Sequence, residues 1–308
     1  MNSYIKWFLK LLVFCVLFFV GDKLIGVGYK YLQKTASEKS PQAMIVDYSL
    51  KQVNADVLIF GASEAAHSYV TEILRDSLQM SVYNCGNDGK PAYYHIAIIR
   101  YILSRYTPKL IIWSISPMWL AEDNNDRLSV LNPYYDEIPA CKEMVDKKSK
   151  YESIKCRSDC YKFNSLLYDY MTCIIVPKNN FGYGHYLPLY GTDNNLALQD
   201  RDLEKAFRYS ADLAQEFDKT LELCNKKGVK VALVFTPRYE KSSYEHLKNY
   251  KVLKEISQKN DIPLIEDYYR NPIINQPHNY KDFAHLNDNG AKMFSSMLVS
   301  KLTNWFDE

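Results

Sequence analysis

The sequence predicts an α/β domain built on a parallel sheet and preceded by one membrane-spanning helix. Three observations lead to this prediction. Short apolar runs alternate with segments of helical spacing over residues 55–306, which is typical of a parallel sheet covered on both faces. Residues 120–200 interrupt the alternation and form an insert. A long apolar stretch occupies residues 5–28, close to the N-terminus.

The apolar stretch is the first element. Its unbroken core, residues 11–21, reaches about 20 residues with its apolar flanks, which is enough to cross a bilayer. Lys10 before the core, and Asp22 and Lys23 after it, lie where charged side chains extend to the interface. We expect an uncleaved anchor over residues 1–28.

An anchor has three alternatives. A signal peptide needs a small-x-small cleavage site after the core, and none follows. A lipoprotein site at Cys15 is disfavoured by the bulky Phe14 before it. A buried helix of a soluble protein is the third alternative. The charges leave the orientation open: lysines after the core favour a cytoplasmic C-terminal part, but long domains often translocate regardless.

The remaining elements follow in chain order. Residues 29–54 are polar and are expected to form a stalk, and residues 55–308 the α/β domain. Gly61 ends the first strand, Pro108 follows the second helix and Gly228 closes the long third helix. The predicted strands are residues 55–61, 81–85, 109–115, 229–235 and 262–265, and the predicted helices are 64–79, 93–106, 203–227, 244–259 and 289–306.

The insert at 120–200 is rich in tyrosine and follows the carboxyl end of the third strand. An insert there overhangs the edge at which open α/β sheets bind ligands, so we expect a lid or recognition cap; a surface elaboration is the alternative. It holds Cys141, Cys156, Cys160 and Cys173. The spacing of these cysteines fits no zinc site. If the domain is exported, a disulfide between two of the four is an alternative.

Composition excludes two classes of protein. With 38 Lys+Arg against 36 Asp+Glu the net charge is +2, without the basic excess that nucleic-acid binding requires. With 47% hydrophobic and 24% charged residues the chain is globular rather than disordered.

The candidate chemistry lies at strand ends. Ser63 follows the first strand where a helix begins, so it is a candidate nucleophile whose own N–H group helps hold an oxyanion; a helix N-cap is the alternative. The second strand ends in Asn84-Cys-Gly-Asn-Asp-Gly89, a turn that can direct a backbone N–H group to the same place.

The third part of the site comes from the C-terminal region. Asp282 and His285 are spaced so that the carboxylate can orient the imidazole, although a capping or core histidine is the alternative. Ser63, the glycine turn and this pair all converge on one edge of the predicted sheet. That convergence indicates a Ser-His-Asp site.

These motifs resemble the SGNH/GDSL hydrolase superfamily. Gly61-Ala-Ser63 lies where that family has Gly-Asp-Ser, Asn84-x-x-x-x-Gly89 matches its second block, and Asp282-x-x-His285 its last. The resemblance covers residues 55–119 and 229–306. It implies a flavodoxin-like three-layer α/β/α fold with a five-stranded parallel sheet.

The resemblance also implies roles for these residues. Ser63 would be the nucleophile, His285 the base and Asp282 the orienting acid, with the N–H groups of Ser63 and Gly89 as oxyanion donors. The anchored layout looks like the extracytoplasmic, membrane-tethered branch that includes DltD-like and polysaccharide O-acetyltransferase-related proteins. It implies a periplasmic domain and a membrane acyltransferase as partner.

The chain departs from the family pattern in two places. Ala62 replaces the aspartate of the first block. The Gly-x-Asn-Asp of the third block is missing, and the third strand runs into Ser114-Ile-Ser116-Pro-Met-Trp119. Ser116 is the candidate replacement for the missing asparagine donor. Losing one such donor costs about 10²–10³ in rate in a known protease.

Four further residues are candidate substrate contacts, and a surface histidine of the helix is the alternative for His67. His67 lies four residues after Ser63, Arg238 follows the fourth strand, and His185 lies in the glycine- and tyrosine-rich stretch 182–191. Asn84 is the fourth, and holding its own turn is its alternative. Arg238 would bind an anionic group or form a salt bridge.

We therefore expect a membrane-anchored serine esterase or O-acyltransferase that acts on acyl esters of a cell-envelope glycan. The alternative is a catalytically weak protein of the same fold for glycan binding or envelope assembly. A flavodoxin-like cofactor binder lacks a phosphate-cradling loop. The expected chemistry requires no metal and no organic cofactor.

Overall fold

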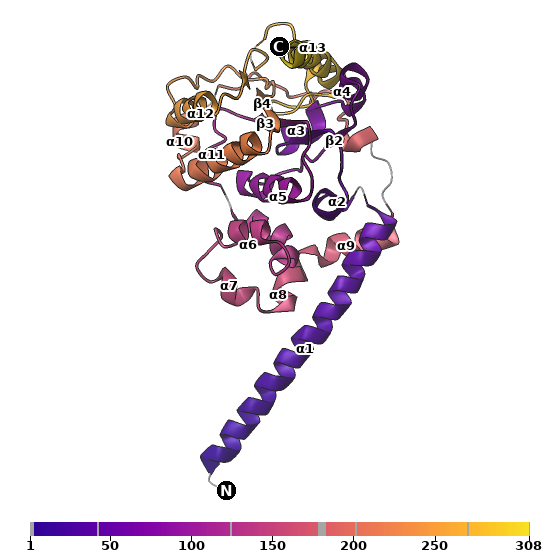
Figure 1. The fold of residues 1–308 in the computed structure, drawn as a ribbon, viewed down its shortest axis with the longest axis vertical. Coiled ribbons are helices and arrows are strands. Elements are labelled where there is room, and N and C mark those ends of the chain that lie inside the picture. The colour runs from indigo at the N-terminus through magenta and orange to yellow at the C-terminus, as the bar shows by residue number, and fades with distance from the viewer. Residues whose placement is uncertain are drawn as a thin grey trace. The chain divides into compact units, whose positions relative to one another are not determined.

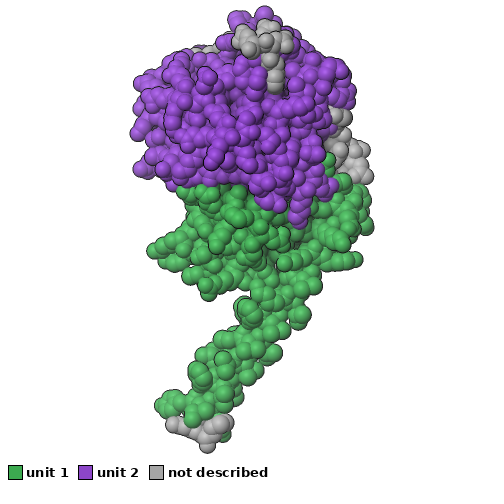
Figure 2. Space-filling view, viewed as in Figure 1, with its two compact units in different colours: residues 1–48, 128–179 green, residues 49–127, 180–308 purple. Residues whose placement is uncertain are grey.

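The computed structural model describes residues 3–41, 43–123, 125–177, 183–200, 202–269 and 271–307. The chain divides into two compact units, which Figure 2 shows in two colours. Unit 1 comprises residues 1–48 and 128–179, and unit 2 comprises residues 49–127 and 180–308. Unit 2 contains the sheet.

The sheet is parallel, has five strands and has the order β2-β1-β3-β4-β5. The predicted α/β fold is therefore confirmed. The direction of chain progression reverses between β1 and β3, which is the switch point at which such sheets bind ligands. The strands are β1 (Val57–Phe60), β2 (Val82–Asn84), β3 (Leu110–Ile115), β4 (Lys230–Phe235) and β5 (Leu264–Ile265).

Helices cover both faces of the sheet, which completes the three layers (Figure 1). One face carries α3 (Ser63–Ser68), α4 (Thr71–Leu78) and α13 (Asp288–Asp307). The other carries α5 (Ala92–Arg105) and α11 (Ala211–Lys226), with α12 (Lys248–Lys259) beside α11. Shorter helical segments of this unit are α10 (Leu203–Ala206), η3 (Tyr183–His185) and η4 (Pro277–Asn279), and η1 (Asn125–Tyr134) continues into unit 1.

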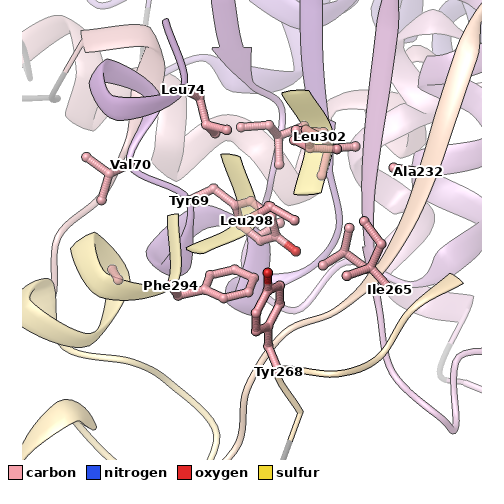
Figure 3. Packing of buried hydrophobic residues seen from close by; sticks show 14 of the residues in the cluster. Tyr69, Val70, Leu74, Ala232, Ile265, Tyr268, Phe294, Leu298 and Leu302 are labelled. Atoms are coloured by element: carbon pink, nitrogen blue, oxygen red, sulfur yellow. The ribbon is translucent and has the colours of Figure 1, made fainter. Parts of the chain in front are cut away.

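Alternate residues of each strand pack into different layers, as a period of two requires. Val57 and Ile59 of β1 belong to the cluster that includes Tyr69, Phe294 and Leu298, part of which Figure 3 shows. Their neighbour Phe60 contacts His95 of α5 at 6.4 Å between ring centroids. The two apolar layers hold the strand ends, and hence the residues that follow them, in fixed positions.

Two predicted helices are interrupted. The helix expected over 64–79 consists of α3 and α4, separated by the extended residues Tyr69 and Val70, because the Val70 N–H donates to Ser295 Oγ of α13 at 2.8 Å. The helix expected over 203–227 is divided into α10 and α11. Ser210 caps α11 by accepting from the Leu213 N–H at 3.3 Å, which starts a new helix there.

Unit 1 contains the N-terminal helix α1 (Ser3–Lys39), which is long and apolar enough to cross a membrane. Residues 29–39, expected as a polar stalk, continue this helix. Tyr29 stacks on Phe163 at 5.6 Å, and Ala36 is fully buried with Tyr170 and Cys173. These residues are helical rather than an extended stalk because one side of the helix packs against Phe163, Tyr170 and Cys173.

The predicted insert 120–200 is shared between the units. Its residues 128–179 belong to unit 1, and the described residues 183–200 belong to unit 2. A lid over Ser63 stays a prediction. All seven cysteines are free thiols, including the four of the insert. The helices of unit 1 are α2 (Ile45–Lys51), α6 (Pro139–Val145), α7 (Glu152–Lys155), α8 (Asp159–Phe163), η2 (Asn164–Leu166) and α9 (Leu167–Ile175), with α2 extending into unit 2.

Candidate active site

Ser63 is the first residue of α3, directly after the carboxyl end of β1. Ala62 occupies the N-cap position, and the Ser63 hydroxyl makes no cap hydrogen bond there. Instead its Oγ lies 2.7 Å from Nε2 of His285. The N-cap alternative for Ser63 is therefore wrong, and its side chain is directed at the histidine.

Asp282 holds the other side of the His285 ring. Nδ1 of His285 lies 2.9 Å from each carboxylate oxygen of Asp282. One of these oxygens also accepts from the backbone N–H groups of Ala284 at 2.8 Å and His285 at 3.0 Å. Partial burial alone raises the pKa of Asp282, but the hydrogen bonds from the His285 ring and these backbone groups outweigh it and leave the pKa below its ordinary value.

The arrangement fixes the tautomer of His285. A carboxylate is an acceptor, so Nδ1 carries the proton and Nε2 presents its lone pair to the Ser63 hydroxyl. A serine, a basic nitrogen and an orienting carboxylate thus lie in one hydrogen-bonded chain. This chain can remove the proton from the hydroxyl as its oxygen attacks an electrophile.

Two glycines shape the strand ends around Ser63. Gly61 has φ +141°, and a Cβ there would lie 2.6 Å from the Ser114 carbonyl oxygen of β3, so only glycine fits this end of β1. Gly89 has φ +65° and is the third residue of a turn closed by the Lys90 N–H to the Asn87 carbonyl at 3.2 Å.

Asn84 holds this turn from inside the fold. It is fully buried, its Nδ2 donates to the Ala65 carbonyl at 2.7 Å, and its Oδ1 accepts from the Gly86 N–H at 2.8 Å. The structure therefore gives Asn84 the structural role, and the expected substrate contact is wrong because the side chain is buried against backbone.

His67 lies one turn after Ser63 on α3, and only 11% of its side chain is exposed. Nδ1 lies 2.7 Å from the Leu187 carbonyl oxygen and Nε2 3.2 Å from the Asp88 carboxylate. Burial alone lowers the pKa of His67, but these two acceptors outweigh it and the pKa is raised above 6.5. Sequence analysis missed Asp88, although it belongs to the turn that ends in Gly89.

His185 packs against strand β2 of the sheet. It is buried, and its ring stacks on Tyr83 of β2 with centroids 5.8 Å apart. Two residues further on, the Leu187 N–H donates to the Ala66 carbonyl of α3 at 3.1 Å. The expected pocket contact of His185 is therefore wrong; Gly182 of that stretch lies outside the described residues.

Arg238 forms the salt bridge that was the alternative to anion binding. Its guanidinium lies 2.6 Å from Glu64 and 3.6 Å from Glu240, and the three side chains are 12%, 12% and 0% exposed. Sequence analysis missed Glu64. The sequence could have indicated this ion pair, because Glu64 follows Ser63 directly and Arg238 follows a strand that ends at the same edge of the sheet.

A pocket of about 220 Å³ opens at the carboxyl ends of four strands of unit 2. Ser116 lines it, and so do Ala62 and Glu64, the two neighbours of Ser63. The other lining residues are either apolar or charged. They are Lys90, Ala92, Met118, Trp119, Ala121, Glu122, Asp123, Phe207, Leu213 and Arg238. Ser116 therefore lines a cavity that the two neighbours of Ser63 also line. Within the described residues no cluster of three His, Cys, Asp or Glu side chains is arranged to hold a metal ion.

Comparison with known proteins gives structural similarity only. No family model and no curated protein matches the chain. Among solved structures, a psychrotrophic esterase from Pseudoalteromonas sp. shares 10% identity with a TM-score of 0.42, over 82% of this chain and 98% of that one.

Two further structures are similar at the same level. A protein assigned as an acylhydrolase, from Bacteroides fragilis, shares 13% identity with a TM-score of 0.39, over 80% of this chain and 86% of its own. An acetyl xylan esterase shares 13% with a TM-score of 0.38, over 80% and 98%. All three are ester- or acyl-hydrolysing proteins by name, but similarity this distant says nothing about the activity of this chain. Its function must be argued from its own residues.

Proposed function

We propose that the protein is a membrane-anchored serine esterase or O-acyltransferase of the SGNH type. The observation that carries the proposal is the chain of hydrogen bonds from Ser63 Oγ through His285 to Asp282. It lies beside the switch point of the sheet, where the fold places ligands.

The proposed reaction has two halves. Ser63 Oγ attacks the ester carbonyl carbon while its proton passes to His285 Nε2, and a tetrahedral oxyanion forms. Collapse breaks the bond to the alcohol, which leaves with the proton from His285, and the acyl group stays on Ser63. Water or a sugar hydroxyl then attacks the acyl carbon while its proton passes to His285. The bond between the acyl carbon and Ser63 Oγ breaks, and His285 returns the proton to Ser63.

The oxyanion would lie between backbone and side-chain donors. The Ser63 N–H group belongs to the first turn of α3, so it has no partner within the helix. Gly89 would supply the second N–H group and the Ser116 hydroxyl the third donor. The position of Ser116 in the pocket wall supports this role.

The pocket favours a compact, partly apolar group beside the ester. At about 220 Å³ it has room for one sugar-sized ring or a short acyl chain, and Trp119 and Phe207 offer apolar faces to it. Arg238 is held by Glu64 and Glu240, so we do not assign an anionic substrate. An acylated envelope glycan, as the family resemblance implies, remains the proposed substrate.

The proposed location is extracytoplasmic, with α1 as the anchor. The length and apolar composition of α1 support the anchor, and the resemblance supports the side of the membrane. Protease added to spheroplasts should then digest the domain. Full protection would place it in the cytoplasm.

A second candidate is a glycan-binding or assembly protein with weak activity, favoured by the missing asparagine of the third block. One experiment separates the two. Purified protein is given an O-acetylated envelope polysaccharide, and acetate release and transfer to an added glycan are followed for the wild type and Ser63→Ala. Turnover that needs Ser63 supports the enzyme; equal binding by both proteins without turnover supports the binding protein.

A further inference from the structure

A short segment of unit 1, residues 150–157, presents an unusual surface. Tyr151 and Ile154 are 53% and 62% exposed, which is high for large apolar side chains. The basic residues Lys150, Lys155 and Arg157 of the same segment are also exposed. The segment therefore combines exposed apolar side chains with exposed positive charges.

The single acidic residue of the segment is turned inward. Glu152 is 1% exposed and lies 2.8 Å from Lys155 Nζ and 3.5 Å from Lys148 Nζ, and it accepts from Tyr161 Oη at 2.7 Å. The exposed residues between positions 150 and 157 are therefore cationic or apolar apart from Ser153, and none of them carries a carboxylate. Such a surface is typical of elements that lie on anionic membranes.

The segment is fixed to one level of α1. Asp22 of α1 accepts from Ser158 Oγ at 2.6 Å and from the Asp159 N–H at 2.8 Å, so it caps the start of α8. Lys23 Nζ donates to the Arg157 carbonyl at 2.8 Å. Gly26 makes this close approach possible, since a Cβ there would lie 2.5 Å from Cβ of Asp159. In Figure 1, α8 lies beside the middle of α1.

That level is also where α1 first becomes buried on one side. Every residue from Ser3 to Val20 is exposed, whereas Asp22, Gly26 and Gln33 are buried on one side. Eighteen helical residues extend over about 27 Å, close to the thickness of a bilayer's hydrocarbon layer. Leu24, Ile25 and Val27 extend the exposed apolar surface by about 7 Å beyond Asp22. If α1 spans the membrane, its hydrocarbon part therefore ends close to the level at which residues 150–157 are attached.

We propose that residues 150–157 form a membrane-surface element that binds anionic phospholipid headgroups. Tyr151 and Ile154 enter the headgroup layer, and Lys150, Lys155 and Arg157 contact the lipid phosphates. The proposal rests on α1 as a membrane anchor and not on the activity of Ser63, so an inactive protein leaves it intact. Part of the predicted lid is thereby assigned to the membrane surface.

The test uses the full chain in vesicles of phosphatidylcholine and phosphatidylglycerol with bromine near the headgroup end of the acyl chains. A tryptophan is introduced by Ile154→Trp in a Trp7→Phe background. We expect strong quenching by the bromine and a shift of the emission to shorter wavelength. Tyr151→Trp provides a second probe in case the first variant fails to fold.

Ile175→Trp is the matched control. Ile175 is 68% exposed, lies in the same unit and is also isoleucine. Its neighbour Ile174 accepts from Lys39 Nζ at 3.5 Å, and Lys39 lies 17 residues beyond Asp22, about 25 Å along the helix. We expect no quenching above the Trp7→Phe parent. Equal quenching at positions 154 and 175, or none at 154, overturns the proposal.

The headgroup contact has its own test. Lys150→Gln with Arg157→Gln, combined with Ile154→Trp, should lose most of the quenching, as should vesicles of phosphatidylcholine alone. Quenching that is unchanged in both cases would overturn the binding of anionic headgroups. Circular dichroism and the thermal midpoint verify that each variant is folded.

Discussion

The ring of His67 lies edge-on to the ring of His285, with centroids 5.7 Å apart and planes at 89°. Both nitrogens of His67 face acceptors, the Leu187 carbonyl and the Asp88 carboxylate. Each of these acceptors receives a hydrogen bond from the ring only when both nitrogens carry a proton, that is, when His67 is positively charged. A second histidine–aspartate pair therefore lies against the proposed base, and its charge depends on pH.

This pair predicts a pH-dependent contribution to stability. The pKa of His67 is raised above 6.5 in the folded protein, so the contribution is fully present below pH 6.5 and is lost as pH rises through the folded pKa. His67→Gln should cost about 1–3 kcal/mol at pH 6 and less at pH 9. Urea unfolding of both proteins across this range measures the difference. A difference that is constant with pH would contradict the proposed protonation.

Asp282→Asn should impair catalysis without unfolding the protein. The backbone N–H groups of Ala284 and His285 would hold the amide oxygen, so the NH2 group would face Nδ1 and the ring proton would move to Nε2. Nε2 would then no longer present a lone pair to Ser63. The corresponding change in a serine protease costs about 10⁴ in kcat, and we expect a loss of about 10³–10⁴. Turnover of p-nitrophenyl acetate measures it, and activity within tenfold of the wild type would exclude Asp282 from this role.

Ser116→Ala tests the replacement for the missing asparagine. If the hydroxyl stabilises the oxyanion, kcat should fall by about 10²–10³ while KM changes little. Ser116→Thr keeps a hydroxyl and should retain part of the activity. Equal rates for the alanine variant and the wild type would show that the site works without this donor.

Arg238→Met should destabilise the fold, because it leaves the Glu64 and Glu240 carboxylates buried without their cation. Removing one partner of a buried ion pair costs about 3–5 kcal/mol. Arg238→Met combined with Glu64→Gln should recover part of the loss. Guanidinium unfolding of Arg238→Met, Glu64→Gln and the double variant measures the loss of stability in each. If the loss in the double variant equals the sum of the losses in the two single variants, the two residues are not coupled and the prediction is wrong.

The sheet could be predicted from sequence because its strands are buried on both faces and read as continuous apolar runs, as Leu110–Ile115 shows. Ser63, Asp282 and His285 could be predicted because strand ends of a parallel sheet share one edge. The break between α3 and α4 could not, since it depends on Ser295, which lies 225 residues from Val70 in the chain. Nor could the burial of His185 on Tyr83, which is a tertiary contact between distant segments.

The central claim is that Ser63 is an activated nucleophile. The most direct measurement is labelling of the purified full chain in detergent with a fluorophosphonate probe, for the wild type, Ser63→Ala and His285→Ala. We predict that the wild type is labelled and that both variants, shown to be folded by circular dichroism, are not. Labelling that persists in Ser63→Ala, or a folded wild type that stays unlabelled, would contradict the claim.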